Sequence, residues 1–409
     1  MSTELRVLRP TEWDEWYGKL ELAFGGVAEQ ADERAMWRDL TEIDRSIGVW
    51  DEDECIGTTS AFTFRLSVPG GGLVPAAGVT MVSVLSTHRR RGVLRSMMRR
   101  QLDDVHALGE PLAVLTASEP EIYGRFGYGM ATEQLHAEID TSRVRLTVPE
   151  GADAVRLRLV KPEDAREACE AVYARKVTAR PGMLARQPGW ERLPLLDPPG
   201  DRKGDSPLLC VLAELDGEVV GYARYAINPE WEPAGPKGLV RLYDFEALSP
   251  APRAALWRFL FEIDLTSKLR ARNLPVDAAL LHMVSDIRRC AVGVRDSLHV
   301  RLVDVGAALE ARTYAAPVDV VFEVADAFCP WNEGRWRLTG DAKGASCERT
   351  EDPAELELSV RELGAAYLGG IPLSALASAG RVRELRRGAL AEASTAFRSD
   401  VAPWLPHGF

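Results

Sequence analysis

The sequence predicts a mixed α/β (α+β) fold of three domains, in which one strand-and-helix unit occurs twice and a different α+β domain follows. A chain of 409 residues is too long for one core at about 150 residues per domain. The design of "LRVLRPTEWDEWYGKLELAF" returns near residue 155 in "VRLRLVKPEDAREACEAVY", a strand followed by Pro, acidic residues and an amphipathic helix. From about residue 298 the pattern changes to strands followed by helices. We therefore expect domains at residues 1–142, 143–297 and 298–409.

The elements of the first copy follow from local patterns. A strand in "ELRVLR" leads to a helix that carries Trp13, Trp16 and Leu20, and "ERAMWRDL" predicts a second helix. Strands are predicted in "SIGVWD" and "CIGTTSAFTFRLSV". The apolar, β-branched run "AAGVTMVSVLS" is typical of a strand buried on both faces. This last strand delivers the chain into "THRRRGVL".

The second copy repeats the order of the first. "LLCVLAELDGEVVGYARYAI" predicts a hairpin that turns at Asp216–Gly217, and "GLVRLYDFEALS" predicts a strand before the helix "APRAALWRFLFEI". In the third domain, strands are predicted in "VDVVFEVAD", "RWRLTGD", "SCERT" and "AELELSV", with helices up to "GALAEASTAF".

Composition excludes several classes of function. The formal net charge of −11 argues against a nucleic-acid partner or an anionic lipid surface, so any anion must be bound locally. The N-terminus lacks the apolar core of a secretion signal, and no apolar run of about 18 residues follows. We expect a cytoplasmic protein without a membrane span. The six cysteines and six histidines show no metal-ligand spacing, so we expect buried, reduced thiols and no metal.

The stretch "VLSTHRRRGVLRSMM" predicts an anion site. A buried strand ends at Val84, Gly92 relieves a short turn, and a helix starts. N–H groups in the first turn of a helix have no intrahelical acceptor and lie at the positive end of the helix dipole. The candidate phosphate-binding residues are Arg90, Arg91, Gly92, Val93, Leu94 and Arg95. The alternative is a basic helix start that is simply solvated.

A second stretch, "LAVLTASEPEIYGRFGYGMA" at residues 112–131, has the same design. A buried strand is followed by Ser118 and Glu119, by a short helical turn with Tyr123, and by a glycine-rich return. Taken alone, Tyr123 and Tyr128 are equally compatible with core aromatics whose hydroxyls are satisfied.

These two stretches resemble the GNAT acetyltransferases and, more closely, the Eis (enhanced intracellular survival) family of N-acetyltransferases. The family's acetyl-CoA motif, Gln or Arg, two residues, Gly, one residue, and Gly or Ala, is matched by "RRRGVL", with Leu94 as a bulkier last residue. "ASEPEIYGRFGYG" resembles the second family motif nearly throughout. The resemblance covers essentially the whole chain: two tandem GNAT-like domains and a C-terminal domain that resembles sterol carrier proteins. In the second copy, Pro250 and Pro252 remove N–H groups from the strand-to-helix junction, so its phosphate loop is lost.

The resemblance implies direct acetyl transfer from acetyl-CoA to a primary amine. The backbone N–H groups of Val82, Ser83 and Val84 would polarise the thioester carbonyl. Tyr123 would be the general acid for the leaving thiolate. The C-terminal carboxylate of Phe409 would be the general base for the amine. Ser118 and Glu119 would belong to the cofactor-binding turn.

The resemblance also implies an acceptor pocket, a class of acceptors and an oligomeric state. Phe24 and Trp37 match positions that line the family's acceptor pocket, although each is also compatible with core packing. Gly408 stands where the family has an acidic residue, so one negative charge near the acceptor is missing. Aminoglycosides, polyamines and lysine side chains are the implied acceptors, and a homohexamer built as a pair of trimers is the implied assembly. The alternative is a non-catalytic carrier of a hydrophobic ligand, with the GNAT part as a scaffold.

Overall fold

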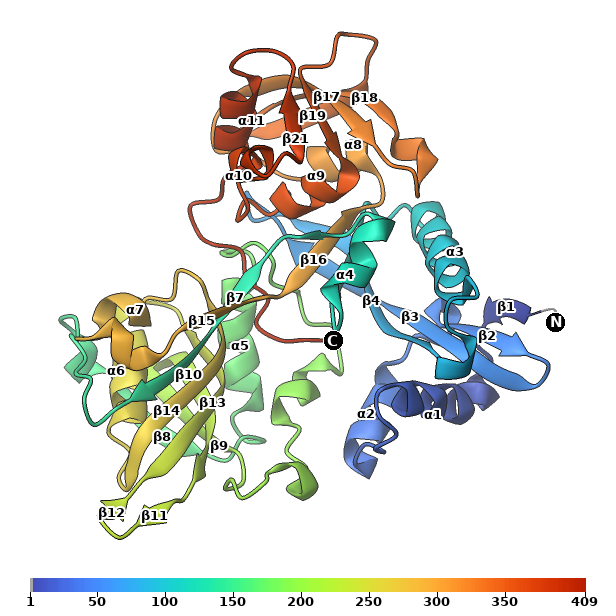
Figure 1. Cartoon of the computed structure of the whole chain (residues 1–409). Helices are drawn as coiled ribbons and strands as arrows, with labels where there is room; N and C mark the ends of the chain where they lie inside the picture. The colour runs from blue at the N-terminus through green and yellow to red at the C-terminus, as the bar shows by residue number, and fades with distance from the viewer. Residues whose placement is uncertain (1–2) are drawn as a thin grey trace. The chain divides into compact units, whose positions relative to one another are not determined.

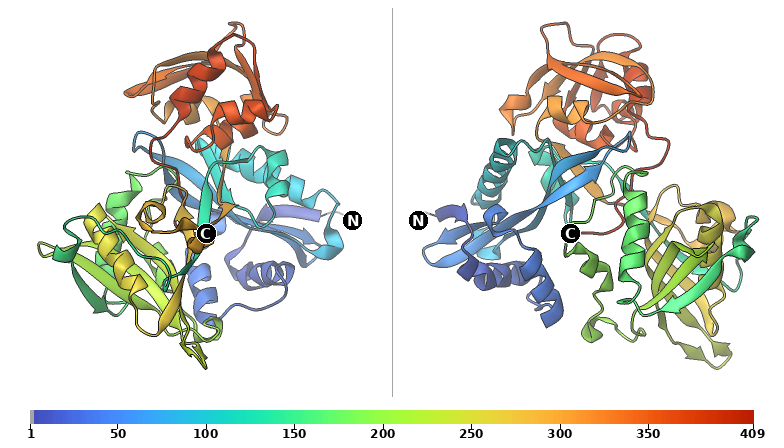
Figure 2. Two further views of the ribbon diagram at one scale, coloured as in Figure 1. Left: turned by 60° about the vertical axis from the view of Figure 1, so that its left-hand side comes forward. Right: turned by 180° about the vertical axis from the view of Figure 1, so that it is seen from behind.

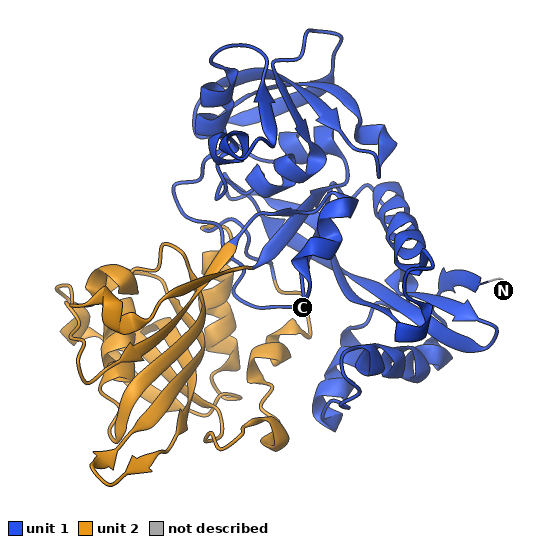
Figure 3. Cartoon of the chain, in the orientation of Figure 1, with its two compact units in different colours: residues 1–132, 180–185, 297–409 blue, residues 133–179, 186–296 orange. Residues whose placement is uncertain are grey.

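The structure is a computed structural model that describes residues 3–409 (Figure 1). It divides into two compact units (Figure 3). Unit 1 comprises residues 1–132, 180–185 and 297–409, and unit 2 comprises residues 133–179 and 186–296. Within the described part of the chain, no helix is long and apolar enough to cross a bilayer. All six cysteines are buried free thiols.

A seven-stranded sheet forms the larger part of unit 1. Its order is β1 (Thr3–Val7), β2 (Ile47–Asp51), β3 (Glu54–Ser67), β4 (Leu73–Val84), β5 (Leu112–Thr116), β16 (Leu298–Leu302) and β6 (Gly129–Met130). Its helices are α1 (Trp13–Ala23), α2 (Ala31–Leu40), α3 (Val93–Ala107) and the short α4 (Pro120–Tyr123). β4 and β5 run parallel, and the other neighbours are antiparallel.

The helices cover both faces of this sheet (Figure 2). On one face Trp13 and Trp16 of α1 pack against Trp50 of β2. On the other face Met97 of α3 packs against Val49, the preceding residue of β2. Because successive side chains of a strand point to opposite faces, α1 and α3 sandwich the sheet between them. The sequence predicted both helices: α1 from its amphipathic pattern and α3 from the turn at Gly92.

A second seven-stranded sheet forms unit 2. Its order is β15 (Gly293–Asp296), β7 (Glu133–Asp140), β14 (Thr266–Pro275), β13 (Gly238–Ala247), β10 (Glu218–Asn228), β9 (Leu209–Leu215) and β8 (Arg156–Val160). The remaining elements of this unit are α5 (Arg166–Val177), α6 (Pro250–Phe261), α7 (Leu280–Met283) and the small hairpin β11 (Trp231–Glu232) with β12 (Gly235–Pro236). The predicted hairpin is present: β9 and β10 pair antiparallel, and both Asp216 and Gly217 have positive φ.

Two strands lie in sheets other than those that the expected ranges suggest. β7 falls in the range 1–142, but it pairs with β14 and β15 in unit 2. β16 falls in the range 298–409, but it pairs with β5 and β6 in unit 1. Hydrophobic alternation predicts that a segment is a strand and says nothing about its neighbours, so local pattern could not place these strands. The division into three domains at those boundaries stays a prediction.

The C-terminal part of unit 1 has its own five-stranded sheet. Its order is β19 (Gly344–Arg349), β18 (Gly334–Asp341), β17 (Val318–Ala325), β20 (Leu356–Ser359) and β21 (Val382–Glu384). Its helices are α8 (Val305–Glu310), α9 (Val360–Ala366), α10 (Leu373–Ser378) and α11 (Ala389–Phe397). The four predicted strands correspond to β17 to β20.

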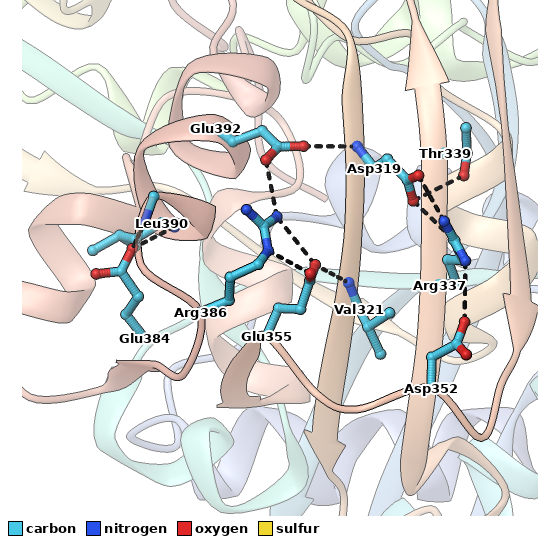
Figure 4. A network of polar contacts seen from close by, with 11 residues as sticks. Asp319, Val321, Arg337, Thr339, Asp352, Glu355, Glu384, Arg386, Leu390 and Glu392 are labelled. Carbon is cyan, nitrogen blue, oxygen red and sulfur yellow. Dashed lines mark hydrogen bonds and ion pairs between the residues drawn. The ribbon is translucent and has the colours of Figure 1, made fainter.

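Ion pairs tie the exposed side of this sheet together (Figure 4). Arg337 contacts Asp319 at 2.7 Å and Asp352 at 3.0 Å, and its guanidinium lowers the pKa of the Asp319 carboxyl. Arg386 bridges Glu355 and Glu392 from the loop after β21. Exposed pairs of this kind each contribute about 0–1 kcal/mol, so they adjust stability and do not create the fold.

The core of the same domain contains a fully buried arginine. The guanidinium of Arg312 donates to the carbonyl oxygens of Thr313 (3.1 Å), Phe397 (2.8 Å) and Tyr367. Tyr367 caps the C-terminal end of α9, and Phe397 is the last residue of α11. The charge therefore satisfies carbonyls at the negative ends of two helix dipoles. The ring of Tyr314 packs against it at 4.7 Å, and burial lowers the pKa of Arg312.

Replacing Arg312 tests this account of the core. Arg312→Met fills much of the space but leaves the carbonyls of Tyr367 and Phe397 without donors. We expect the free energy of unfolding to fall by about 3 kcal/mol, measured by chemical denaturation. Arg337→Met, on the exposed side of the sheet, is the control and should have a much smaller effect. Equal effects in the two variants would contradict the helix-end role of Arg312.

Candidate active site

The site begins where β4 leaves β5. The two strands pair only at Ala76, Ala77 and Gly78, and β4 continues to Val84 without further pairing to β5. A bulge lies in the same region: the register with β3 shifts between Thr58 and Ser60, and Met81 has a φ of 53°. The hydroxyls of Ser83 and Thr58 are 2.7 Å apart. Beyond the point where the strands separate, Val82, Ser83 and Val84 line a cavity.

The turn after β4 has the conformation of an anion-binding nest. Arg90 and Gly92 both have positive φ, at 62° and 84°, and α3 starts at Val93. The N–H of Ser96 makes the first intrahelical bond, to Gly92 at 3.0 Å, so the N–H groups of Val93, Leu94 and Arg95 precede the helical ladder. Left-handed residues next to a helix N-terminus converge N–H groups on one point, which suits phosphate.

One cavity of about 950 Å³ joins these features. It lies entirely in unit 1. The residues lining it are Ala23, Phe24, Val82, Ser83, Val84, His88, Arg89, Arg90, Gly92, Val93, Leu94, Arg95, Ser118, Glu119, Ile122, Tyr123, Arg125, Phe126, Ala327 and Phe328. The lining contains four arginines and His88 but only one acidic residue, Glu119. This excess of basic residues favours an anionic ligand.

Tyr123 lies in the wall of the cavity at the end of α4. Burial, with a smaller contribution from the charge of Glu119, raises its pKa to about 12. Its ring stands edge-on to that of Tyr128, with centroids 6.0 Å apart. A tyrosine with this pKa holds its proton at neutral pH, so its hydroxyl is present as a hydrogen-bond and proton donor.

The aromatic residues predicted for the acceptor occupy two places. Phe24 is 62% exposed and lines the cavity from the end of α1. Trp37 is absent from the lining and stacks on Phe62 at 6.3 Å. Phe62 lies 5.8 Å from Phe64, whose ring is 5.0 Å from that of Phe409. Trp37 and Phe409 thus belong to one row of aromatic rings, joined by Phe62 and Phe64 of β3.

The terminal segment that carries Phe409 is anchored. The N–H of Trp404 donates to Pro181 at 2.9 Å, and Leu405 is buried. The ring of Phe409 lies over Gly78, where a Cβ would come within 3.3 Å of it. Phe409 therefore lies over the last residue of β4 that pairs with β5.

Sequence reasoning found most of the lining and missed one wall. Of the predicted cofactor residues, only Arg91 is absent from the cavity, and its side chain is exposed. Ala327 and Phe328 come from the C-terminal domain, some 200 residues beyond Tyr123. Phe328 packs on Phe126 at 5.0 Å. The segment "DAFCPW" carries no motif that predicts this contact. In residues 3–409 no group of three or more His, Cys, Asp or Glu side chains is placed to hold a metal.

Comparison with known proteins agrees with this geometry. Residues 4–131 and 182–302 each match a model of an acetyltransferase (GNAT) domain, and residues 305–406 match a sterol carrier protein domain. The chain is 35% identical over 411 residues to N-acetyltransferase Eis of Mycobacterium tuberculosis, with 96% of each chain covered. The chain belongs to the Eis family of N-acetyltransferases.

Other relatives extend the match over the full length of the Eis-family chain. A Streptomyces avermitilis protein described as an uncharacterised N-acetyltransferase is 69% identical over all of both chains. The crystal structure of Eis1 from Mycobacterium abscessus matches with a TM-score of 0.85 and 33% identity, again over all of both chains. The predicted family, the fold class and the acetyltransferase activity are confirmed. GNAT acetyltransferases use acetyl-CoA, and the basic nest and the exposed backbone of β4 fit its phosphates and its thioester.

Gly92 offers a direct test of the nest in this Eis-family enzyme. Its φ of 84° strains any residue with a Cβ, although no neighbour lies within 4 Å of that position. Gly92→Val should therefore disturb the loop without a clash in the core, and we expect about tenfold weaker binding of CoA in calorimetry. Gly109→Val, at φ 72° in equally open space just after α3, is the matched control. Unchanged CoA affinity in Gly92→Val would contradict the nest.

Proposed function

We propose that this enzyme transfers the acetyl group of acetyl-CoA to primary amines by direct attack, with Tyr123 as general acid and the carboxylate of Phe409 as general base. The observation that supports the proposal is the single cavity in which the nest before α3, the end of β4 that no longer pairs with β5, and Tyr123 meet. A phosphate-binding loop, backbone donors for the carbonyl oxygen and an acid are three of the parts that acetyl transfer from a thioester needs, and a base for the amine is the fourth.

One end of the cavity would bind the phosphates of acetyl-CoA, and acetyl transfer would take place at the other end. The nest and the arginines around Gly92 would hold the phosphates of acetyl-CoA, which supplies an activated acetyl group. The N–H groups of Val82–Val84 would stabilise negative charge on the carbonyl oxygen as the amine attacks. Tyr123 would then give its proton to the departing sulfur.

The amine must lose a proton before it attacks. A primary amine that resembles lysine has a pKa of about 10 and is a cation at neutral pH. The carboxylate of Phe409 is anchored through its ring on Phe64 and Gly78, and it would accept that proton. Because Gly408 adds no second negative charge, we expect no strong preference for polycations over amines with a single charge.

Aminoglycosides, polyamines and lysine side chains are the acceptors that we propose to test, and a homohexamer is the proposed assembly. The alternative, a carrier of hydrophobic ligands, draws support from the sterol-carrier-like domain. The centre of that domain contains the Arg312 guanidinium and its carbonyl partners, which is a poor environment for a lipid. Tight binding of acetyl-CoA without turnover on any amine would favour the carrier.

Tyr123→Phe tests the acid. We expect kcat for thiol release to fall about 100-fold, with little change in CoA affinity, because the hydroxyl alone is lost. In the wild type, the pKa of about 12 keeps Tyr123 protonated through the alkaline range, so no falling limb due to Tyr123 should appear below about pH 11. Tyr243→Phe, an exposed tyrosine of unit 2, is the control. Full activity in Tyr123→Phe would remove the acid from the mechanism.

An alanine added after Phe409 tests the base by moving the carboxylate. We expect kcat at pH 7 to fall about 100-fold and to recover toward the wild-type value above about pH 10, where the amine deprotonates in solution. The same alanine added before Met1 is the control. A drop that is equally deep at every pH would show that the extension blocks the site and would argue against Phe409 as a base.

A further inference from the structure

The turn that carries Tyr123 rests on the C-terminal domain. Gly127 has a φ of 87°, and a Cβ there would lie 2.8 Å from Nε of Arg301 and 2.9 Å from Val360 of α9. At Gly129 a Cβ would overlap the backbone of Arg361 in the same helix. The glycines of "YGRFGYG" are therefore explained by close packing against β16 and α9, and not by approach of the cofactor.

A buried ion pair lies beneath this turn. Arg301 of β16 is fully buried, and its guanidinium contacts Asp326, directly after β17, at 2.7 Å. Asp326 also accepts from the N–H of Cys329 at 3.0 Å and from Nδ2 of Asn332 at 3.0 Å. The carboxylate is thus fixed by three donors. Nε of Arg301, on the side of Gly127, has no hydrogen-bond partner among the described residues.

Tyr128 connects the turn above Arg301 to Tyr123. The N–H of Tyr128, the residue after Gly127, donates to the carbonyl of Tyr123 at 3.3 Å. Tyr128 is 1% exposed, and its ring packs edge-on against Tyr123 at 6.0 Å. Its hydroxyl makes no hydrogen bond within residues 3–409. Burial raises the pKa of the Tyr128 phenol, and the buried charge of Arg301 offsets part of that rise. Arg301, Gly127, Tyr128 and Tyr123 form one continuous packed series.

We propose that Arg301, locked by Asp326, is a positioning residue that sets the place of Tyr123 in the cavity, so that the C-terminal domain serves the acetyl-transfer site. The proposal rests on the role of Tyr123 given above. No bond is made or broken at Arg301. Its contribution is to hold the acid where the thiolate develops, and a displacement of about 1 Å at such a site costs up to about 100-fold in rate.

Arg301→Lys tests the proposal while keeping the charge. Lysine lacks the planar fork that both fills the space under Gly127 and contacts Asp326. We expect kcat to fall at least about tenfold, with CoA affinity within about twofold of wild type, because the nest before α3 is untouched. Gly127→Ala disturbs the same contact from the other side and should give the same split between kcat and affinity, should Arg301→Lys not fold. Equal losses of kcat and CoA affinity would overturn the proposal.

A double-mutant cycle separates positioning from general damage. In the Tyr123→Phe background, Arg301→Lys should have almost no further effect on kcat, because the hydroxyl that it positions is gone. A further fall as large as in the wild-type background would overturn the proposal. Full activity of Tyr123→Phe alone would instead remove the acid, and with it the proposed function on which the inference rests.

Unit 2 offers a matched control for the loss of a buried pair. Arg224 is also fully buried and contacts Asp244 at 2.7 Å through a single guanidinium nitrogen. Arg224→Lys should lower the stability of the chain as Arg301→Lys does and leave kcat of the folded enzyme within about twofold. A drop in kcat like that of Arg301→Lys would show that any buried-pair loss slows the reaction and would overturn the proposal.

Discussion

The site depends on one interruption in a hydrogen-bond ladder. β4 and β5 pair at three residues, the last of which is Gly78, and then part. The cavity lies beyond this last pair, and Phe409 lies over Gly78 itself. Continued pairing with β5 would use the N–H groups on the open side of Val82–Val84 and would close the cavity. The bulge at Met81 turns β4 away at a cost in local strain, and the contact between Thr58 and Ser83 holds the turned strand to β3.

Unit 2 shows that the interruption alone does not make a site. β13 pairs with β14 only as far as Leu242, and five further residues continue to Ala247. However, its following helix α6 begins at Pro250 with a second proline at 252, so the first turn lacks the donors that α3 offers. Phe245 stacks on Trp257 of that helix at 4.7 Å, as in an ordinary core. The second copy of the fold therefore lacks the helix start that forms the nest in the first copy.

The structural features that the sequence predicted are those formed by residues close together in the chain. A strand, a glycine at positive φ and a helix start are encoded within some fifteen residues, so the nest at Gly92 could be located from "RRRGVL". The Asp216–Gly217 hairpin is predictable for the same reason. The positions of β7 and β16 were not predictable, because each is set by a partner more than a hundred residues away. Phe328 was not predicted to line the cavity for the same reason, because its contact with Phe126 joins segments about 200 residues apart.

Long-range contacts connect the cavity of the first domain with the C-terminal part of the chain. The nest before α3 lies within the first hundred residues, but the turn that carries Tyr123 packs on Arg301 at Gly127, and Phe409 lies over Gly78. The proposed acid and the proposed base therefore both depend on segments that follow unit 2 in the chain. A truncated first domain would keep the nest, but it would lose Phe409 and the contacts beneath Tyr123. If Tyr123 and Phe409 have the proposed roles, the C-terminal domain completes the acetyl-transfer site.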